Sequence, residues 1–528
     1  MIKKTVVRKN RYFDSVFLMQ VARRIAAEPG IKDASALLCT EANKKVLVEL
    51  GYGEAGGDTE FASAGPNDLV LALEGEKSAV MAVAADPETR LQRPASSSVG
   101  TAREPRSLAE AAALSPRSGV AVISVPGEYA ARESRAALRE GLNVFLFSSN
   151  VSVADEISLK TEARQKGLIV MGPDCGTAFI GGAGIGFANA VRRGPVGIVG
   201  SSGTGIQEFS CMVHRAGCGI SHAIGTGSRD LSDAIGGIST MTAIDALEAD
   251  RDTKVIVVIS KPPGQGATAR LRERLARSSR PVVLCLLGAH RPVEPEQAAG
   301  GLNEASTIDE AVSLALQAPG VNGATRRPLD PEAARVEAAL QVSRMRQGQR
   351  YVRGLFAGGT LCYQAQGIFR DAGLLVHSNS PIPGMRELED PRTSRESSLV
   401  DMGAEIFVEG RSHPMIDASY RRKRLEEEGN DTSVALIILD FILGAISSRD
   451  PAGDLAETIR AVREAARRRG DHLCVVASVC GTEEDAQGLA AQTKKLLEAG
   501  ALVFPSAAEA AVFAREIALK LNRRKEAR

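Results

Sequence analysis

The sequence predicts a multi-domain α/β protein built on parallel β-sheets, with a small α/β domain at the amino terminus. Two observations favour this fold class. Short runs that are apolar throughout recur along the chain, as strands do when helices cover both faces of their sheet. Segments with the spacing of amphipathic helices lie between these runs and end at glycine or proline. Strands and helices that alternate in this way form doubly wound sheets.

The strand-like runs are rich in β-branched residues, and each is short enough to be one buried strand. In chain order they occupy residues 118–126, 142–149, 167–172, 196–200, 254–260, 280–288, 434–440 and 472–480. The helical segments between them include ARESRAALREG and TARLRERLARSS.

Changes in composition divide the 528 residues into four predicted domains. The first closes near the segment RPASSSVG, and the polar stretch VNGATRRPLDPEAAR introduces the last. The predicted domains span residues 1–98, 104–190, 193–317 and 350–520.

The composition excludes several classes of function. A net charge of +1 gives no general attraction to nucleic acid or to an anionic membrane. No apolar run approaches the ~20 residues that span a bilayer, and the segment MIKKTVVRKNRYFDSVF has no features of a secretory signal. The 8 cysteines form no C-x-x-C pair and the 6 histidines no H-x-x-x-H pair. We therefore expect reduced thiols, no built-in metal site and a cytoplasmic protein.

The stretch VGIVGSSGTGIQE is the strongest candidate binding site. An apolar run ends at Val199, and glycines and hydroxyls follow before a helical pattern resumes. Backbone amides can converge on an anion in such a loop, and the start of the helix adds partial positive charge. A tight turn that needs glycine only for packing is the alternative. The residues predicted to bind the anion are Ser201, Ser202, Gly203, Thr204 and Gly205.

A second loop of this kind follows the run VALIILD. Small and hydroxyl residues come after the strand-like run, and Pro451 and Asp454 suit the start of a helix. Alone, the loop is equally well an ordinary turn, but with the first loop it suggests one anion held from two sides. The candidate ligands here are Gly444, Ala445 and Ser447.

Three further segments stand out. The stretch GRSHPMID contains Arg411 and His413, VMGPDCGT is a tight turn that contains Asp174, and GLFAGGT is another glycine-rich strand exit. For His413, a loop histidine that only bonds to backbone is the alternative to a role in chemistry. His290 follows a strand-like run and is a further candidate, whereas Cys175 has no evident partner base and is expected to be structural.

With VGIVGSSGTGIQE, VMGPDCG and SVCGTEEDAQ, the chain resembles the succinyl-CoA synthetase superfamily. Residues 105–317 are similar to most of the alpha subunit, and residues 350–520 to the carboxyl-terminal ligase domain of the beta subunit. Both parts in one chain, behind RYFDSVFLMQVARRI and with GRSHPMID, look like the FdrA family. The resemblance implies Rossmann-like and flavodoxin-like parallel sheets.

The chain departs from those ligases at three features. The glycine-rich loop that takes the CoA phosphates, the Gly-His-Ala-Gly-Ala loop of the phosphohistidine and the ATP-grasp domain have no counterpart here. What the resemblance still implies is a phosphate site between the loops 201–205 and 444–448, without CoA. Glu208 takes the position of the glutamate that contacts the phosphohistidine in those ligases, so the resemblance implies that Glu208 is a catalytic residue.

FdrA-type proteins are associated with purine and allantoin catabolism as one subunit of an oxamate carbamoyltransferase. The resemblance thus implies phosphate or carbamoyl phosphate as a substrate, no cofactor in this chain, and partner protein subunits. Arg411, Arg229 and Asp174 are then the candidate substrate contacts, and His413 is the candidate acid or base. Two alternatives stay open: an ADP-forming acyl-CoA synthetase that acts with partner subunits, and a non-catalytic scaffold or sensing subunit.

Overall fold

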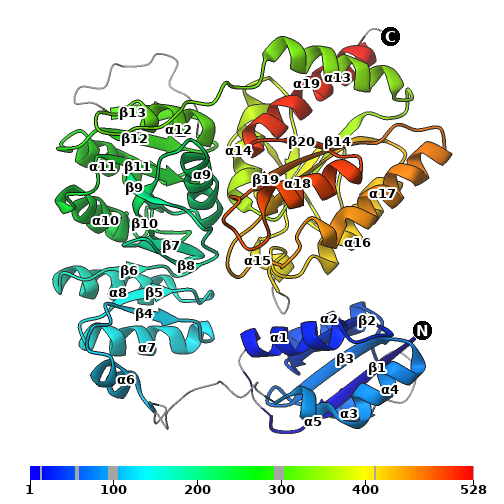
Figure 1. The fold of residues 1–528 in the computed structure, drawn as a ribbon, viewed down its shortest axis with the longest axis horizontal. Coiled ribbons are helices and arrows are strands. Elements are labelled where there is room, and N and C mark those ends of the chain that lie inside the picture. The colour runs from blue at the N-terminus through cyan, green and yellow to red at the C-terminus, as the bar shows by residue number, and fades with distance from the viewer. Residues whose placement is uncertain are drawn as a thin grey trace. The chain divides into compact units, whose positions relative to one another are not determined.

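The computed structural model describes residues 1–11, 13, 15–53, 59–92, 105–289, 302–408 and 412–526 (Figure 1). The chain divides into two compact units. The first contains Met1–Glu104 and Glu405–Ser412, and the second contains Pro105–Ala404 and His413–Arg528. The predicted site residues whose positions are described lie in the second unit.

The first unit is built on a three-stranded antiparallel sheet in the order β1-β3-β2. Because side chains alternate along a strand, Leu71 of β3 faces α1 and α4, whereas Val70 faces α2 and α3. The elements of this unit are β1 (Ile2–Arg8), α1 (Ser15–Ala26), β2 (Ile31–Leu38), α2 (Glu41–Glu49), α3 (Thr59–Ser63), β3 (Leu69–Gly75), α4 (Lys77–Ala85), α5 (Pro87–Arg90) and α15 (Glu405–Val408).

The second unit begins with a three-stranded parallel sheet in the order β4-β5-β6. Helices α7 and α8 cover the face that carries Val144 and Leu146, and Phe145 of the same strand packs toward the following domain. The elements are α6 (Leu108–Leu114), β4 (Val120–Ile123), α7 (Gly127–Arg139), β5 (Asn143–Leu146), α8 (Val153–Gln165) and β6 (Val170–Met171).

A seven-stranded sheet follows, in the order β13-β12-β11-β9-β10-β7-β8. The strands from β13 to β10 are parallel, and the β7–β8 hairpin pairs antiparallel with β10. The elements are β7 (Thr177–Ile180), β8 (Ala183–Gly186), β9 (Arg193–Gly200), α9 (Gly203–Arg215), β10 (Ile220–Gly225), α10 (Ile238–Ala249), β11 (Val255–Ser260), α11 (Gln265–Leu275), β12 (Val282–Leu286), β13 (Leu302–Ala305) and α12 (Ile308–Leu316).

A second seven-stranded sheet has the order β16-β15-β17-β14-β18-β19-β20, with parallel pairs throughout the described strands. The elements of this part are α13 (Pro331–Arg344), β14 (Tyr351–Phe356), α14 (Gly359–Arg370), β15 (His377–Ser378), β16 (Arg386–Glu387), β17 (Ser398–Asp401), α16 (Ser419–Asn430), β18 (Val434–Ile442), α17 (Gly453–Arg468), β19 (Cys474–Cys480), α18 (Leu489–Glu498), β20 (Leu502–Phe504) and α19 (Ala507–Glu526).

One hydrophobic core joins the two seven-stranded sheets (Figure 1). Helices α9 and α12 cover the inner face of the first sheet, and α13, α14 and α19 contribute apolar residues from the second. Helices α10 and α11 cover the outer face of the first sheet. Alternate residues of β11 serve the two faces, since Val257 lies in the shared core and Val258 lies on the outer side.

An ion network is buried between α8 and the loop after β10. The Lys160 ammonium lies 2.6 Å from a carboxylate oxygen of Glu156 and 2.7 Å from one of Asp230, and all three side chains are fully buried. Asp230 also accepts the amides of Ser239 and Thr240 at the start of α10. The network therefore fastens the three-stranded sheet to the domain that follows.

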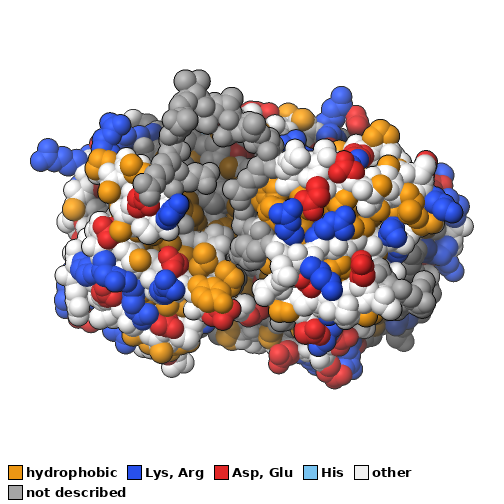
Figure 2. Space-filling model, turned by 90° about the horizontal axis from the view of Figure 1, so that it is seen from below, with side chains coloured by type: hydrophobic (Ala, Val, Ile, Leu, Met, Phe, Trp, Pro, Cys, Tyr) orange, Lys and Arg blue, Asp and Glu red, His pale blue; other side chains and the backbone are white. Residues whose placement is uncertain are grey.

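The predicted α/β fold class with parallel sheets is confirmed, and each predicted strand-like run coincides with a strand. Within the predicted domain 104–190, the β7–β8 hairpin pairs with β10 of the following sheet and not with the preceding three strands. In the part of the chain that is described, no helix is both long and apolar enough to cross a membrane. On the face in Figure 2, basic and acidic side chains are interspersed.

Candidate functional site

The first turn of α9 has the geometry of an anion site. Ser202 is its N-cap residue, and the Ser202 hydroxyl accepts the amide of Gly205 at 3.0 Å. Among the described residues, no acceptor bonds to the amides of Gly203 and Thr204, and both residues are partly exposed. Free amides and the positive end of the helix dipole together stabilise an anion at such a helix start.

The hydroxyl of Thr177, the first residue of β7, lies beside the start of α9. Its side chain is 1% exposed, and its Oγ1 has no hydrogen-bond partner among the described atoms. A Cβ atom on Gly203 would lie 3.4 Å from this oxygen. Because a buried hydroxyl without a partner costs free energy, this group is a candidate ligand contact beside the start of α9.

The start of α14 faces the start of α9. The hydroxyls of Ser202 and Thr360 are hydrogen-bonded to each other. A Cβ atom on Gly358 would lie 3.2 Å from the Cβ atom of Thr204. The glycine-rich strand exit GLFAGGT supplies this second helix start. The element opposite the first predicted loop is therefore α14.

Carboxylates already occupy the start of α14. Asp440 accepts the amides of Ala357 and Gly358, each at 2.7 Å, and Arg421 donates to the same carboxylate at 2.6 Å. Asp401, at the end of β17, lies against the first residue of α14, and burial raises the pKa of its carboxyl. The first turn of α9 contains no acidic residue, so an anion is better stabilised there.

His413 lies beside the loop that leads into α14. A Cβ atom on Gly403 would lie 2.7 Å from His413 Nε2 and 2.8 Å from the carbonyl oxygen of Ala357. His413 Nδ1 accepts the amide of Met415 at 3.3 Å. Burial, and after it the charge of Lys261, lowers the pKa of His413 to about 4. The neutral ring thus carries its proton on Nε2, which suits a hydrogen-bond donor and not a base.

The free energy of unfolding is expected to decrease in acid because of His413. A histidine with its ordinary pKa of 6.5 takes up a proton in the unfolded chain at a pH where the folded protein, with a pKa of about 4, does not. Stability should therefore fall as the pH falls through this window, and less so in His413→Gln. Urea unfolding of both proteins above and within the window measures the difference. Equal losses would show that His413 is not the group responsible.

In the second predicted loop the amides of Gly444 and Ala445 bond within the protein, so these two amides are not offered to the anion that loops 201–205 and 444–448 are predicted to hold. The amide of Gly444 donates to the Gln487 side chain at 3.4 Å, and that of Ala445 donates to a backbone carbonyl at 2.9 Å. Gly444 has a φ of +129°, so glycine is needed for the turn itself. Ser447 has a buried hydroxyl for which the described residues provide no partner.

Glu208, predicted as catalytic, makes a structural contact. Its side chain is 1% exposed, and its carboxylate accepts the amide of Ala507, the first residue of α19, at 3.0 Å. Asp309, which is partly exposed, lies near this carboxylate, and burial, aided by the charge of Glu208, raises the pKa of Asp309 to about 6. Glu208 therefore connects α9 to α19 through the shared core.

The predicted substrate contacts lie on other loops. Arg229 forms an ion pair with Glu156 at 2.9 Å and bonds to the carbonyl of Val151. The Asp174 carboxylate lies 3.5 Å from the hydroxyl of Ser228. The guanidinium of Arg229 is thus already engaged with α8. Two other candidates, Arg411 and His290, lie outside the described residues.

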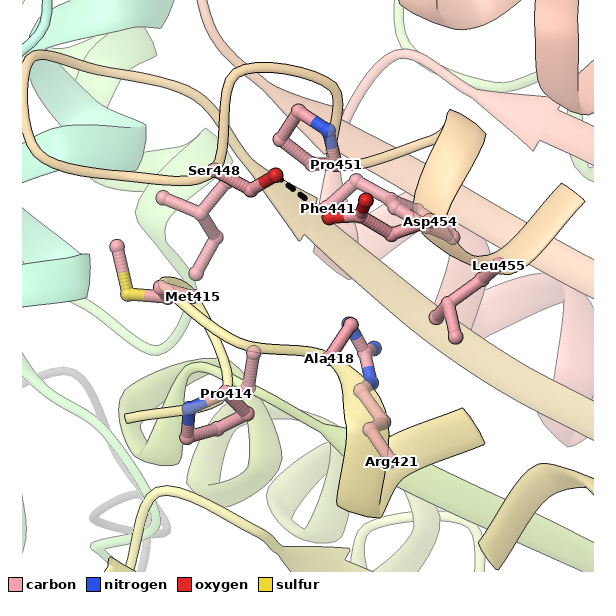
Figure 3. A pocket seen from close by; sticks show the side chains of 11 residues that line it. Pro414, Met415, Ala418, Arg421, Phe441, Ser448, Pro451, Asp454 and Leu455 are labelled. Carbon is pink, nitrogen blue, oxygen red and sulfur yellow. Dashed lines mark hydrogen bonds between the residues drawn. The ribbon is translucent and has the colours of Figure 1, made fainter. Parts of the chain in front are cut away.

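A small cavity lies behind the start of α14 (Figure 3). Arg421, Asp454 and Ser448 line it, and the Ser448 hydroxyl donates to Asp454 at 2.5 Å. Its volume of about 10 Å³ suffices for one water molecule. The cavity is too small for a substrate, so the start of α9 remains the candidate ligand site.

Sequence analysis did not find four residues of this site. Asp440 ends a predicted strand and Thr360 ends a glycine-rich strand exit, so the position of each at the carboxyl end of a parallel strand was an available signal. Thr177 ends the segment VMGPDCGT, which sequence analysis singled out as a turn but not for its hydroxyl. Asp401 lies in no predicted strand-like run and reaches the site through the pairing of β17 with β14.

Comparison with known proteins defines the class of these domains. Residues 355–517 match a family described as CoA-ligase, residues 191–286 a CoA binding domain, and residues 1–107 a family described as AllF, heavy metal-associated domain. YahF of Escherichia coli (strain K12) is 41% identical over 525 residues, which cover 98% of this chain and 99% of YahF. The chain belongs to the succinyl-CoA synthetase-like family that includes YahF.

More distant relatives share parts of the chain. The ADP-forming succinate–CoA ligase subunit alpha 2 of Archaeoglobus fulgidus is 27% identical over 175 residues, which cover 32% of this chain and 59% of that subunit. The solved structure of dinucleotide-forming acetyl-coenzyme A synthetase 1 from Ca. Korarchaeum cryptofilum has 18% identity and a TM-score of 0.30, with 77% of this chain and 84% of that chain covered. A score this low says nothing about activity.

The description of the amino-terminal family raises the question of a heavy metal in the first unit. Residues 1–104 include one cysteine, Cys39, and no histidine. The Cys39 thiol is buried, and burial raises its pKa. Soft metals prefer thiolate and imidazole ligands, and within the described ranges no three candidate ligands lie together. These residues do not fit a heavy-metal site.

Proposed function

We propose that the chain is a subunit of an oxamate carbamoyltransferase of the FdrA type, which acts with partner subunits in purine and allantoin catabolism. The reaction interconverts oxalurate plus phosphate with oxamate plus carbamoyl phosphate. One observation carries the proposal: at the start of α9 two amides and the nearby Thr177 hydroxyl have no partner within the described part of the chain, and the first turn contains no acidic residue. This combination suits a phosphate group.

The proposed chemistry is a direct attack by bound phosphate on the carbamoyl carbon of oxalurate. A carbon–oxygen bond forms, the bond from that carbon to the oxamate nitrogen breaks, and the proton of hydrogen phosphate passes to this nitrogen. His413 donates from Nε2 to the carbonyl oxygen, where negative charge develops. Asp401, at the start of α14, is an acceptor for the amide hydrogens of the substrate.

This reaction uses neither CoA nor ATP, and we propose that the chain binds no CoA tightly. The start of α7 is the helix start that follows β4 in the predicted domain 104–190, whereas the match to a CoA binding domain covers residues 191–286. Backbone oxygens of Ser149 and Asn150 lie against it, and a Cβ atom on Gly127 would overlap both. A helix start covered by carbonyl oxygens does not suit a pyrophosphate.

The test is phosphate-dependent turnover of oxalurate by the chain together with its co-purified partners. We expect carbamoyl phosphate to form only when phosphate is present, at a rate that CoA does not change, and calorimetry with CoA to give no specific heat. A matched assembly that lacks this chain is the control, and equal turnover without the chain would refute the proposal.

The second candidate is an ADP-forming acyl-CoA synthetase that works with partner subunits. It is favoured by the match of residues 355–517 to a CoA-ligase family. Formation of a thioester from ATP, CoA and a carboxylic acid, with no turnover of oxalurate, would support this candidate over the transferase.

A further inference from the structure

Lys261 follows the last residue of β11, next to the loop that opens α9. The amide of Ser201 donates to the carbonyl of Ile259 at 3.1 Å, and the hydroxyls of Ser201 and Ser260 lie 2.8 Å apart. These bonds fix the carboxyl ends of β9 and β11 beside each other, as parallel pairing requires. The backbone of Lys261 is thereby held beside the start of α9.

The side chain of Lys261 extends toward α14. Its ammonium lies 5.3 Å from the ring centroid of Tyr363, which is in the second turn of that helix. Its charge lowers the pKa of His413 and acts in the same direction on the carboxyl of Asp401, so it is felt by both groups near α14. The ammonium is thus held at the side of α14 that carries Tyr363, and its charge acts on the two residues proposed to face the carbamoyl group.

The ammonium has no ion-pair or hydrogen-bond partner among the described residues, and Lys261 is partly exposed. Asp440, the other carboxylate at the start of α14, is already paired with Arg421 and with two amides. A lysine ammonium is a compact, strongly hydrated charge with three donors, and it seeks acceptor oxygens. The Tyr363 ring alone does not supply them.

We propose that Lys261 is a ligand-binding residue of this site, whose ammonium donates to the oxygens of a phosphate bound at the start of α9. The inference rests on the proposed function for the identity of the anion. The Lys261 ammonium supplies the full positive charge that the backbone amides of α9 do not carry. This charge also offsets the repulsion between phosphate and the Asp401 carboxylate. A lysine suits this role because it binds phosphate as a point charge.

The test is calorimetric titration of the full chain with inorganic phosphate. In Lys261→Met we expect the dissociation constant to rise about tenfold or more, as the loss of one charge-assisted hydrogen bond requires. Lys261→Arg should recover part of the affinity because it restores the charge. Lys254→Met is the matched control, since Lys254 precedes the same strand β11 and donates to the carbonyl of Arg251.

A second readout locates the charge independently of phosphate. Removal of the ammonium should raise the pKa of His413, which NMR titration of the imidazole measures. If Lys261→Met binds phosphate within about twofold of the wild-type protein, the proposal for Lys261 is wrong while the proposed function stands. If the wild-type protein itself binds no phosphate, the anion site and the proposed function both fail.

Discussion

Replacement of Gly205 by valine is expected to abolish phosphate binding and phosphate-dependent turnover. A Cβ atom at this position would lie 2.6 Å from the Ser202 hydroxyl, 3.0 Å from Ile259 Cγ2 and 3.2 Å from Thr360 Cγ2. The hydroxyl must move, and it then loses its bonds to the Gly205 amide and to Thr360. Loss of two charge-assisted bonds from a disordered first turn corresponds to a decrease in affinity of about 100-fold or more.

Two further variants separate this effect from a general loss of folding. Overpacking at Gly205 costs about 1–3 kcal/mol of stability. Ser202→Ala is therefore measured as well, because it removes the N-cap hydroxyl without adding volume and costs about 1 kcal/mol of stability. Gly367→Ala is the control, since a Cβ atom there makes only ordinary contacts at 3.8 Å. Normal phosphate affinity in both Gly205→Val and Ser202→Ala would place the anion elsewhere.

Replacement of Lys160 by methionine is expected to lower the free energy of unfolding by about 3–5 kcal/mol, because it removes the buried ammonium that lies between Glu156 and Asp230 and leaves Arg229 as the ion-pair partner of Glu156. Asp230 keeps its bonds to two amides, but the ammonium between the two carboxylates is lost. Urea denaturation measures the change.

Lys166→Met is the matched control for this buried network. Lys166 also pairs with a glutamate four residues earlier, Glu162, at 2.8 Å, but these side chains are 38% and 31% exposed. An exposed pair of this kind contributes about 0.3–0.5 kcal/mol. If the two substitutions lower the free energy of unfolding equally, the buried network does not contribute substantially to the packing of the three-stranded sheet against the next domain.

The fold class and the first turn of α9 could be predicted from the sequence because both are local. A strand, a glycine-rich loop and a helix follow one another within VGIVGSSGTGIQE, and the structure has them in that order. The apolar strand-like runs likewise predict parallel sheets, although they do not predict the order of the strands within each sheet. By contrast, the sequence suggested Gly444 as the second half of the site by its similarity to the first loop, whereas its amide bonds within the protein.

The sequence by itself therefore determined the elements and one helix start that suits an anion, since hydrophobic period and turn chemistry are encoded in neighbouring residues. Only the tertiary structure decided what surrounds that helix start. Thr177, Thr360 and Asp401 come from three separate strands or helices, and strand pairing and the shared core bring them together. The same packing turned Glu208 toward α19, because a side chain's partner depends on which helix lies opposite.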